Sequence, residues 1–205
     1  MDCIYTWMRS GSAAGNEIVR VIAGKYRRRR LKALAGVKTR PTSDRLRETL
    51  FNVLAVGAIA LEDSVWIDVY AGTGAVAIEA LSRGARMVYL VESSRAAARL
   101  IRENLKSLGI TEGFQLTESE AGKALRQLDA AAVAADVVFL DPPYADQDAY
   151  DETLGFLSQS RLLSEATVVI AEHDKRFDPG VRVGSLVRYR LLTQGDAALS
   201  FYRRG

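Results

Sequence analysis

The sequence predicts an α/β fold behind a short basic arm. From Val65 onward, apolar runs of strand length alternate with segments of helical periodicity, and the last two apolar runs follow each other without a helix between them. Such alternation is typical of a mostly parallel sheet covered by helices, while the two closing strands should pair antiparallel at one sheet edge. The chain has 205 residues, 48% of them hydrophobic, so it can form one domain with a full core.

The arm and one helix precede this alternation. Residues 19–24 and 30–34 are predicted to be two short strands of a hairpin whose connection carries basic side chains. Thr42, Ser43 and Asp44 are candidate N-cap residues for a helix that continues through Leu54. The remaining strands are expected at 65–69, 87–91, 114–117, 137–140, 167–171, 186–192 and 198–203, and the helices after 74, at 96–108, near 120–128 and near 149–157.

A glycine turn after the first of these strands is typical of a nucleotide-type cofactor site. Gly72 and Gly74 permit positive φ angles and a close approach of a ligand, and the next helix presents its N-terminal amides. Glu92 ends the second strand about 20 residues later, where an acid can bind ribose hydroxyls. Dinucleotides and S-adenosylmethionine both fit this pattern, and the segment even matches the fingerprint G-x-G-x-x-A. Asp68 favours S-adenosylmethionine, because a carboxylate there would repel a pyrophosphate but suit an ammonium group.

A second motif, Asp141-Pro142-Pro143-Tyr144, closes the strand at 137–140. The prolines have no N–H, so the sheet ladder cannot extend and their carbonyls remain available as acceptors. Asp141 is a further acceptor, and Tyr144 offers a ring for stacking. A planar group that carries an NH2, such as the amino edge of a nucleobase, would satisfy these groups together. The alternative is a strand-ending turn with a buried tyrosine.

The charge distribution favours the nucleobase interpretation. The net charge is +3, but eleven basic residues and one acid lie between Arg20 and Arg47, and the rest of the chain has 17 basic and 24 acidic residues. This density indicates a polyanion surface. The candidate nucleic-acid-binding residues are Lys25, Arg27, Arg28, Arg29, Arg30, Arg40, Arg45 and Arg47.

The sequence also bears on where the protein is located and on whether it has a disulfide or a metal site. No apolar stretch reaches the ~18 residues that span a bilayer, and residues 1–16 lack the apolar segment of a signal peptide. We therefore expect a cytoplasmic protein. The single cysteine, Cys3, cannot form an internal disulfide. His173 is the only histidine and has no cysteine beside it, so we expect a locally bonded side chain and no metal site.

Six stretches resemble the bacterial family that methylates the exocyclic N2 of a guanine in small-subunit (16S) ribosomal RNA, within the class I S-adenosylmethionine-dependent methyltransferases. They are VIAGKYRRRRL, RPTSDRLRETLFN, DVYAGTGAVAIEALSRGA, LVESS, FLDPPY and ALSFYRR. The resemblance covers most of the chain from Val19 to Arg204 and implies a Rossmann-like, three-layer α/β/α fold. Its sheet would have seven strands in the order 3-2-1-4-5-7-6, mostly parallel with one antiparallel strand. It also implies a tail at 1–18, an RNA-binding hairpin and lead helix at 19–60, and a methyltransferase domain at 61–205.

The resemblance further implies which residues act. Asp141 and the Pro142 carbonyl would accept the two N–H bonds of the guanine amine, so that its lone pair faces the sulfonium methyl group. Tyr144 would stack on the extruded base. The substrate would be 16S rRNA in an assembling small subunit, and the protein a monomer. The catalytic candidates are Asp141, Pro142, Pro143 and Tyr144, and the cofactor-binding candidates are Asp68, Gly72 and Gly74 at the methionine end, Glu92 at the ribose, Glu120 and Ala121 at the adenine, with Tyr70, Thr73 and Ser93 beside them.

Other functions stay open at this point. One is methylation of DNA at adenine N6, or of a protein glutamine, although the basic arm argues against a protein substrate and the small size leaves no separate DNA-reading domain. Methylation at cytosine C5 requires a thiolate, and Cys3 lies in the leader. A catalytically silent RNA-binding assembly factor would not need the intact Asp141 and Gly72-Thr73-Gly74.

Overall fold

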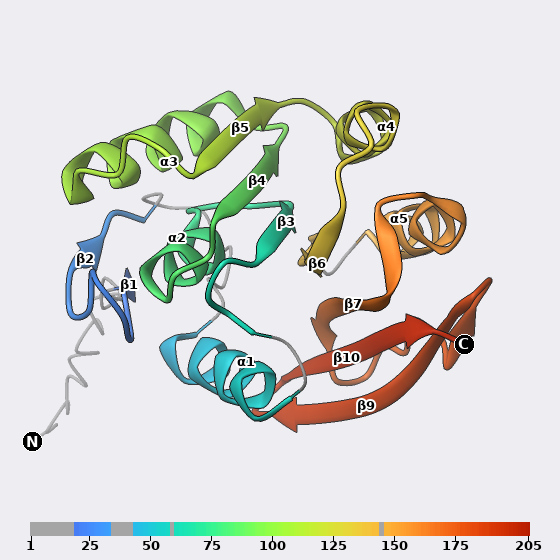
Figure 1. Ribbon diagram of the computed structural model, residues 1–205. Helices are drawn as coiled ribbons and strands as arrows, with labels where there is room; N and C mark the ends of the chain where they lie inside the picture. Colours follow the sequence, from blue (N-terminus) through green and yellow to red (C-terminus); the bar gives the residue numbers. More distant parts are fainter. Residues whose placement is uncertain (1–18, 34–42, 58–59, 144–145) are drawn as a thin grey trace, which may run out of the picture.

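The structure, a computed structural model, describes residues 19–33, 43–57, 60–143 and 146–205. The expectations for the 1–18 tail, Arg40, Thr42 and Tyr144 therefore lie outside the described residues. Helices cover both faces of one large sheet and make three layers, with the arm packed beside them (Figure 1). This is the predicted α/β architecture.

The main sheet has eight strands in the order β5-β4-β3-β6-β7-β10-β9-β8. Its first five strands are parallel, and β10 runs antiparallel to both neighbours. The first seven positions reproduce the predicted order 3-2-1-4-5-7-6. The strands are β3 (Val65–Val69), β4 (Met87–Glu92), β5 (Phe114–Glu118), β6 (Ala135–Leu140), β7 (Leu163–Asp174), β8 (Arg182–Val183), β9 (Leu186–Gln194) and β10 (Ala197–Arg204).

The predicted count of seven strands, with one antiparallel, is wrong by one strand. The short β8 pairs antiparallel with β9 and forms the sheet edge, so β9 and β10 pair as expected but lie inside that edge. Two residues are too few to show the period-2 pattern by which a strand is detected in a sequence. Strand β8 therefore could not be predicted.

In the described residues, three helices cover one face of the sheet and two cover the other. The first group is α1 (Asp44–Val56), α2 (Ala75–Ser82) and α3 (Arg95–Leu108), and the second is α4 (Ala121–Ala130) and α5 (Gln147–Gln159). All five residues of β3 are buried, as expected for a parallel strand that is covered on both sides. Of the described helices, none combines the length and the apolar content that a membrane crossing needs.

The N-terminal end of α1 is as predicted. Of the three candidate caps, Ser43 is the N-cap, and its hydroxyl accepts a hydrogen bond from the Leu46 amide at 3.2 Å. The buried residues of α1 form one stripe that packs on the sheet, where Phe51 stacks on Trp66 at 5.2 Å between ring centroids. Trp66 is therefore a core residue.

The arm is a hairpin with a shorter ladder than predicted. Strands β1 (Val19–Arg20) and β2 (Arg30–Leu31) pair antiparallel over two residues each. Val21 still bonds across the hairpin to Arg28 and Arg29, but the amides of Ile22 and Ala23 donate instead to the buried carboxylate of Glu79 on α2, at 2.7 and 3.0 Å. The arm is thus fastened to the main body by side-chain acceptors, which a sequence pattern does not reveal.

At Gly24 the backbone of the arm packs directly against the end of α2. Its φ is +77°, and a Cβ atom there would lie 1.8 Å from the Ser82 carbonyl oxygen, which itself accepts from the Lys25 amide at 2.7 Å. Gly109 offers a matched control, because its φ is +70° and an added Cβ would meet no atom within 4 Å.

We expect Gly24→Ala to destabilise the protein more than Gly109→Ala does. Both substitutions place a Cβ in the left-handed region, at a cost of about 1 kcal/mol, and only Gly24→Ala adds a backbone clash of about 2 kcal/mol or more. Urea unfolding of the two variants measures the difference. Equal free energies of unfolding would show that the arm does not dock on α2 in this way.

Candidate functional site

The candidate residues of both motifs meet at the carboxyl ends of neighbouring parallel strands. Asp68 lies in β3, Glu92 ends β4, and Asp141 follows β6. The order of the sheet reverses between β3 and β6, since β4 and β5 extend to one side and β7 to the other. Open α/β sheets bind ligands in the crevice at such a switch point. The topology therefore brings together two motifs that are far apart in the sequence.

The glycine turn between β3 and α2 is held in an unusual backbone conformation. Tyr70, Gly72 and Gly74 all have left-handed φ angles, of +69°, +55° and +74°. For a bulky residue such as Tyr70 this conformation is rare, and strain of this kind concentrates at functional sites. The Tyr70 hydroxyl lies 2.8 Å from Thr153 Oγ1, so its side chain reaches α5. The turn is thereby linked to the helix that follows the Asp-Pro-Pro motif.

The carboxylate of Glu92 fixes the glycine turn to the end of β4. Its Oε2 accepts from the Gly72 amide and its Oε1 from the Ser94 amide, both at 2.8 Å. Each carboxylate oxygen can accept a further bond. The sequence predicted a ribose acceptor here, and the structure adds that the same group shapes the turn. Ser93, the neighbouring candidate, is exposed.

Asp68 is a buried acid in β3, four residues before Gly72 of the same turn. Only 2% of its surface is exposed, and its Oδ2 accepts from the Ala77 amide in the first turn of α2 at 3.1 Å. Burial raises the pKa of Asp68 to about 7, and the charge of Glu92 adds to this effect. A cation beside this carboxylate would stabilise its charged form.

The raised pKa of Asp68 predicts a pH-dependent cost of folding. The unfolded carboxyl ionises near its ordinary pKa of 3.8, whereas the folded one holds its proton to about 7. The contribution of Asp68 to stability therefore falls as the pH rises through this interval and is constant above it. We expect Asp68→Asn to raise the free energy of unfolding by about 1 to 3 kcal/mol at pH 8, with the gain disappearing toward about pH 4. Urea titrations at several pH values test this, and a loss of stability at every pH would contradict it.

The Asp-Pro-Pro motif turns the chain from β6 into α5. The Asp141 amide donates to the Val69 carbonyl of β3 at 3.4 Å, and the Pro143 carbonyl accepts from the Asp146 amide at 2.8 Å. Burial raises the pKa of the Asp141 carboxyl well above its ordinary value, and the charges of Glu172 and Asp68 raise it further. Three carboxyl groups are thus near one another at the ends of β3, β6 and β7.

Glu172 is a member of this cluster that the sequence did not identify. It is buried near the end of β7, and because Leu140 pairs with Ala171, Glu172 lies beside Asp141 in the next strand. The usable signal would have been a carboxylate at the end of a buried strand that is adjacent to β6.

His173 is locally bonded, as expected. Its Nδ1 lies 2.9 Å from the Asp174 carbonyl oxygen and its Nε2 lies 2.9 Å from Ser200 Oγ. Burial lowers the pKa of the imidazole. The contact with Ser200 joins β7 to β10.

The adenine-side candidates follow β5, which pairs with β4. Glu120 is the N-cap residue of α4 and Ala121 is its first residue. The Ser119 amide donates to the Glu92 carbonyl at 3.0 Å, so this loop runs beside the end of β4. Thr73, in the glycine turn, accepts through its carbonyl from Asn104 Nδ2 at 3.0 Å.

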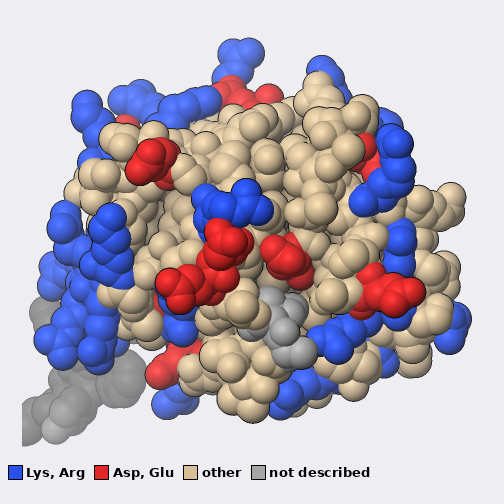
Figure 2. Space-filling model, in the orientation of Figure 1, with Lys and Arg blue, Asp and Glu red and all other residues tan. Residues whose placement is uncertain are grey.

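Most of the predicted basic surface is exposed on the arm and on α1. Figure 2 shows a dense group of lysine and arginine side chains at the left of the molecule, where Figure 1 places the arm, and further groups elsewhere on this face. Arg29 also donates to the Ser107 carbonyl on α3 at 2.9 Å. The exposed candidates are Lys25, Arg27, Arg28, Arg29, Arg30 and Arg45.

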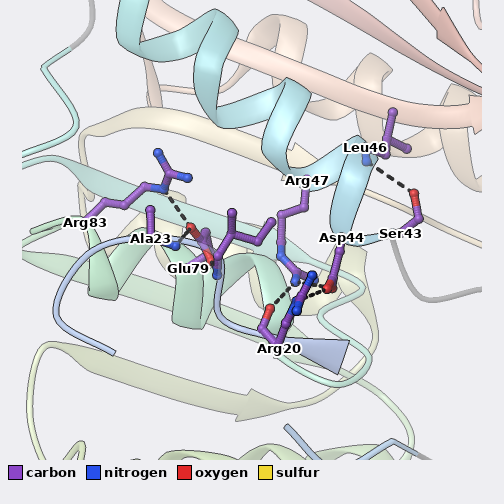
Figure 3. Close-up of polar contacts among 9 residues, drawn as sticks. Arg20, Ala23, Ser43, Asp44, Leu46, Arg47, Glu79 and Arg83 are labelled. Atoms are coloured by element: carbon purple, nitrogen blue, oxygen red, sulfur yellow. Dashed lines mark hydrogen bonds and ion pairs between the residues drawn. The ribbon is translucent and has the colours of Figure 1, made fainter. Parts of the chain in front are cut away.

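The prediction that Arg47 contacts nucleic acid is wrong for this structure, because its side chain is fully buried. Its Nη2 donates to the Arg20 carbonyl and pairs with Asp44 Oδ1 at 2.9 Å (Figure 3). Arg47 precedes Phe51 by four residues and Leu54 by seven, which places it on the inner stripe of α1. The prediction rested on the density of basic residues in the sequence, which does not show which face of the helix Arg47 occupies.

Comparisons with known proteins point to one family. Residues 19–203 match the family described as "Conserved hypothetical protein 95". A curated relative from Bacillus subtilis, named "Putative rRNA methyltransferase YlbH", is 33% identical over 186 residues, which cover 91% of this chain and 99% of the relative. The Ribosomal RNA small subunit methyltransferase D of Escherichia coli is 30% identical over 197 residues, or 96% of each chain. A solved structure described as "Putative methyltransferase yhhF" from Escherichia coli superimposes with a TM-score of 0.77 at 31% identity, over 91% of this chain and 98% of that one.

Proposed function

Because the chain belongs to the family described as "Conserved hypothetical protein 95", whose curated relatives are named rRNA methyltransferases, we propose that it methylates the exocyclic N2 amine of a guanine in 16S rRNA. It is an S-adenosylmethionine-dependent rRNA methyltransferase. The predicted family, enzyme class and cofactor are confirmed. The guanine N2 position and the roles of single residues are our proposal.

The proposal depends most on the juxtaposition of Asp141 with the glycine turn. The Asp141 amide donates a hydrogen bond to the carbonyl of Val69 in β3, one residue before the left-handed Tyr70. The charge of Asp68 also raises the pKa of the Asp141 carboxyl group. An acceptor for a base amine therefore lies beside the residues that we assign to the cofactor. A methyl transfer requires this proximity, because donor and acceptor must react within one site.

The residues around the turn fit S-adenosylmethionine. The buried Asp68 would bind the ammonium group of its methionine end, and Glu92 would accept bonds from its ribose hydroxyls. At Gly72 an added Cβ would approach only the Tyr70 carbonyl oxygen, at 3.9 Å, so the backbone is open to a ligand. Glu120 and Ala121 would border the adenine. When bound, the cofactor supplies an electrophilic methyl group.

On the substrate side, Asp141 and the Pro142 carbonyl would orient the amine. An exocyclic amine is a poor nucleophile because its lone pair is delocalised into the ring, and two acceptors for its N–H bonds favour the tetrahedral geometry that frees this pair. After methyl transfer the nitrogen must lose a proton. The raised pKa of Asp141 suits its carboxylate to accept that proton. Tyr144 would stack on the base.

Glu92→Ala tests the cofactor assignment. We expect S-adenosylmethionine to bind more weakly by about 1 to 3 kcal/mol, because charge-assisted hydrogen bonds are lost. Glu118→Ala is the matched control, since Glu118 pairs with Glu92 in register but lies on β5 and forms ion pairs with Arg95 and Arg102. Calorimetric titration should show near wild-type affinity for the control. Tight binding of NADH, with no response to S-adenosylmethionine, would overturn the assignment.

We further propose that residues 19–60 hold the RNA and residues 61–205 the cofactor, and that the protein acts as a cytoplasmic monomer on 16S rRNA in an assembling small subunit. The exposed arginines of the arm support this division. The test is methyl transfer from labelled S-adenosylmethionine to immature small subunits, naked 16S rRNA and duplex DNA in parallel. We expect label in the ribosomal substrates. Label in DNA alone would favour the alternative DNA methyltransferase, and RNA binding without any transfer would favour a silent assembly factor.

A further inference from the structure

A cavity of about 450 Å³ lies beside the arm and the start of α1, lined by Arg20, Arg28, Arg30 and Asp44. Arg20 and Arg30 are direct partners in the hairpin, one on β1 and one on β2. Like charges at directly opposed positions repel each other and destabilise a strand pair. Arg28 approaches from the connection, where its φ of +68° is unusual for a residue with a side chain. Three guanidinium groups therefore converge on one space.

Among the described residues that line this cavity, Asp44 is the only one with a carboxylate, and that carboxylate also contacts a buried arginine. Asp44 Oδ2 accepts from Arg20 Nε at 2.9 Å, and its Oδ1 pairs with the buried Arg47 at 2.9 Å (Figure 3). A buried guanidinium needs a counter-charge, so the charge of Asp44 is divided between the cavity and Arg47. The cavity keeps a positive excess that a bound anion would neutralise.

The contact with Asp44 also orients Arg20. It uses Nε, and therefore leaves the two Nη groups, which can form parallel hydrogen bonds to the oxygens of a phosphate. Asp44 belongs to α1, and Arg47 of the same helix donates to the Arg20 carbonyl. Both the backbone and the guanidinium of Arg20 are thus held against a helix of the core.

We propose that this cavity is a phosphodiester subsite that fixes one backbone phosphate of the RNA substrate between Arg20, Arg28 and Arg30. This inference rests on the proposed function. It assigns one phosphate contact of the RNA to a specific cavity, where the proposed function assigned RNA binding only to the charged arm as a whole. Arg20, which was not among the predicted RNA-binding residues, becomes the best-oriented of the three. Its role would be to set the position of the RNA, because phosphate contacts fix register and do not read bases.

The test compares Arg20→Gln with Arg86→Gln. Both arginines are exposed, at 64% and 61%, and each pairs with an aspartate, Arg20 with Asp44 at 2.9 Å and Arg86 with Asp63 at 3.2 Å. The two substitutions remove the same charge from the same kind of ion pair, and only one lies in the cavity. Binding of a 16S rRNA fragment would be measured by filter retention over a range of salt concentrations.

We expect Arg20→Gln to weaken RNA binding several-fold and to reduce the slope of log affinity against log salt by up to about 0.7, the value for the complete loss of one phosphate contact on a single strand. Arg86→Gln should leave both quantities unchanged. Equal effects of the two variants, or no effect of Arg20→Gln, would overturn the subsite. The assay measures RNA binding and needs no methyl transfer. Its result is therefore independent of whether the methyl-transfer experiment supports the proposed enzymatic function.

A double-mutant cycle tests whether one phosphate is shared. If Arg20 and Arg30 bind the same group, Arg20→Gln/Arg30→Gln should lose less affinity than the product of the two single losses, while Arg86→Gln/Arg30→Gln should be multiplicative. Arg30→Gln alone also gives the salt slope if the Arg20 variant does not fold. Independent effects of Arg20 and Arg30 would mean separate contacts and would overturn the proposal.

Discussion

Asp141→Ala should reduce the rate of methyl transfer by about 100-fold or more while S-adenosylmethionine affinity stays within about threefold of wild type. This split is expected when a residue orients the reacting atom and does not hold the cofactor. The structure adds a second expectation. Burial and the charges of Glu172 and Asp68 raise the pKa of Asp141, so its charged form is disfavoured in the folded state, and removing it should not destabilise the protein.

Single-turnover rates, calorimetric titration and thermal unfolding measure these three quantities on the same variant. Asp141→Asn is the conservative companion, since it keeps the shape and one acceptor oxygen and should retain part of the rate. A loss of cofactor affinity as large as the loss of rate would place Asp141 in the cofactor pocket. A large fall in melting temperature would assign it a structural role.

Replacing Arg27, Arg28, Arg29 and Arg30 with alanine should lower RNA affinity and flatten its salt dependence together. Because Arg28 and Arg30 would share one phosphate, the four side chains would contact up to three phosphates. The slope of log affinity against log salt should then fall by up to about 2, at roughly 0.7 per contact on single-stranded RNA. Cofactor binding should persist, because the residues assigned to the cofactor lie at the ends of β3, β4 and β5. The preference for a particular base should also survive.

Four basic residues of α3 provide the control for this variant. Arg95, Arg99, Arg102 and Lys106 are exposed, and the three arginines form ion pairs with Glu118 or Glu103. Their replacement by alanine removes the same nominal charge from a different surface and should change the salt slope much less. An unchanged slope in the arm variant would show that the arm is only a solvated surface and that the RNA footprint lies elsewhere.

The order of strands in the main sheet could be predicted because its apolar runs are long and the resemblance to a family supplies their arrangement. The ends of β3, β4 and β6 were also predictable, since Asp68, Glu92 and Asp141 interrupt or end those runs. The predictions that were wrong concern features that depend on tertiary contacts. The hairpin ladder is short because Glu79, nearly 60 residues away in the sequence, takes the amides of Ile22 and Ala23.

Tertiary structure also explains two errors about site residues, one residue wrongly included and one missed. Arg47 was assigned to the RNA surface because it ends a basic run, but its place on the buried stripe of α1 decides its environment. Glu172 was passed over because nothing in its local sequence marks it. It lies next to Asp141 only because β7 pairs with β6.

The proposed methyl acceptor is the N2 amine of a guanine in 16S rRNA. The most direct measurement uses small subunits that lack this modification, labels them with S-adenosylmethionine carrying a radioactive methyl group, and separates the nucleosides after digestion of the 16S rRNA. We predict that the label migrates with N2-methylguanosine and is absent when the Asp141→Ala protein is used. Label in another nucleoside, such as N6-methyladenosine or 5-methylcytidine, would show that guanine N2 is not the methyl acceptor.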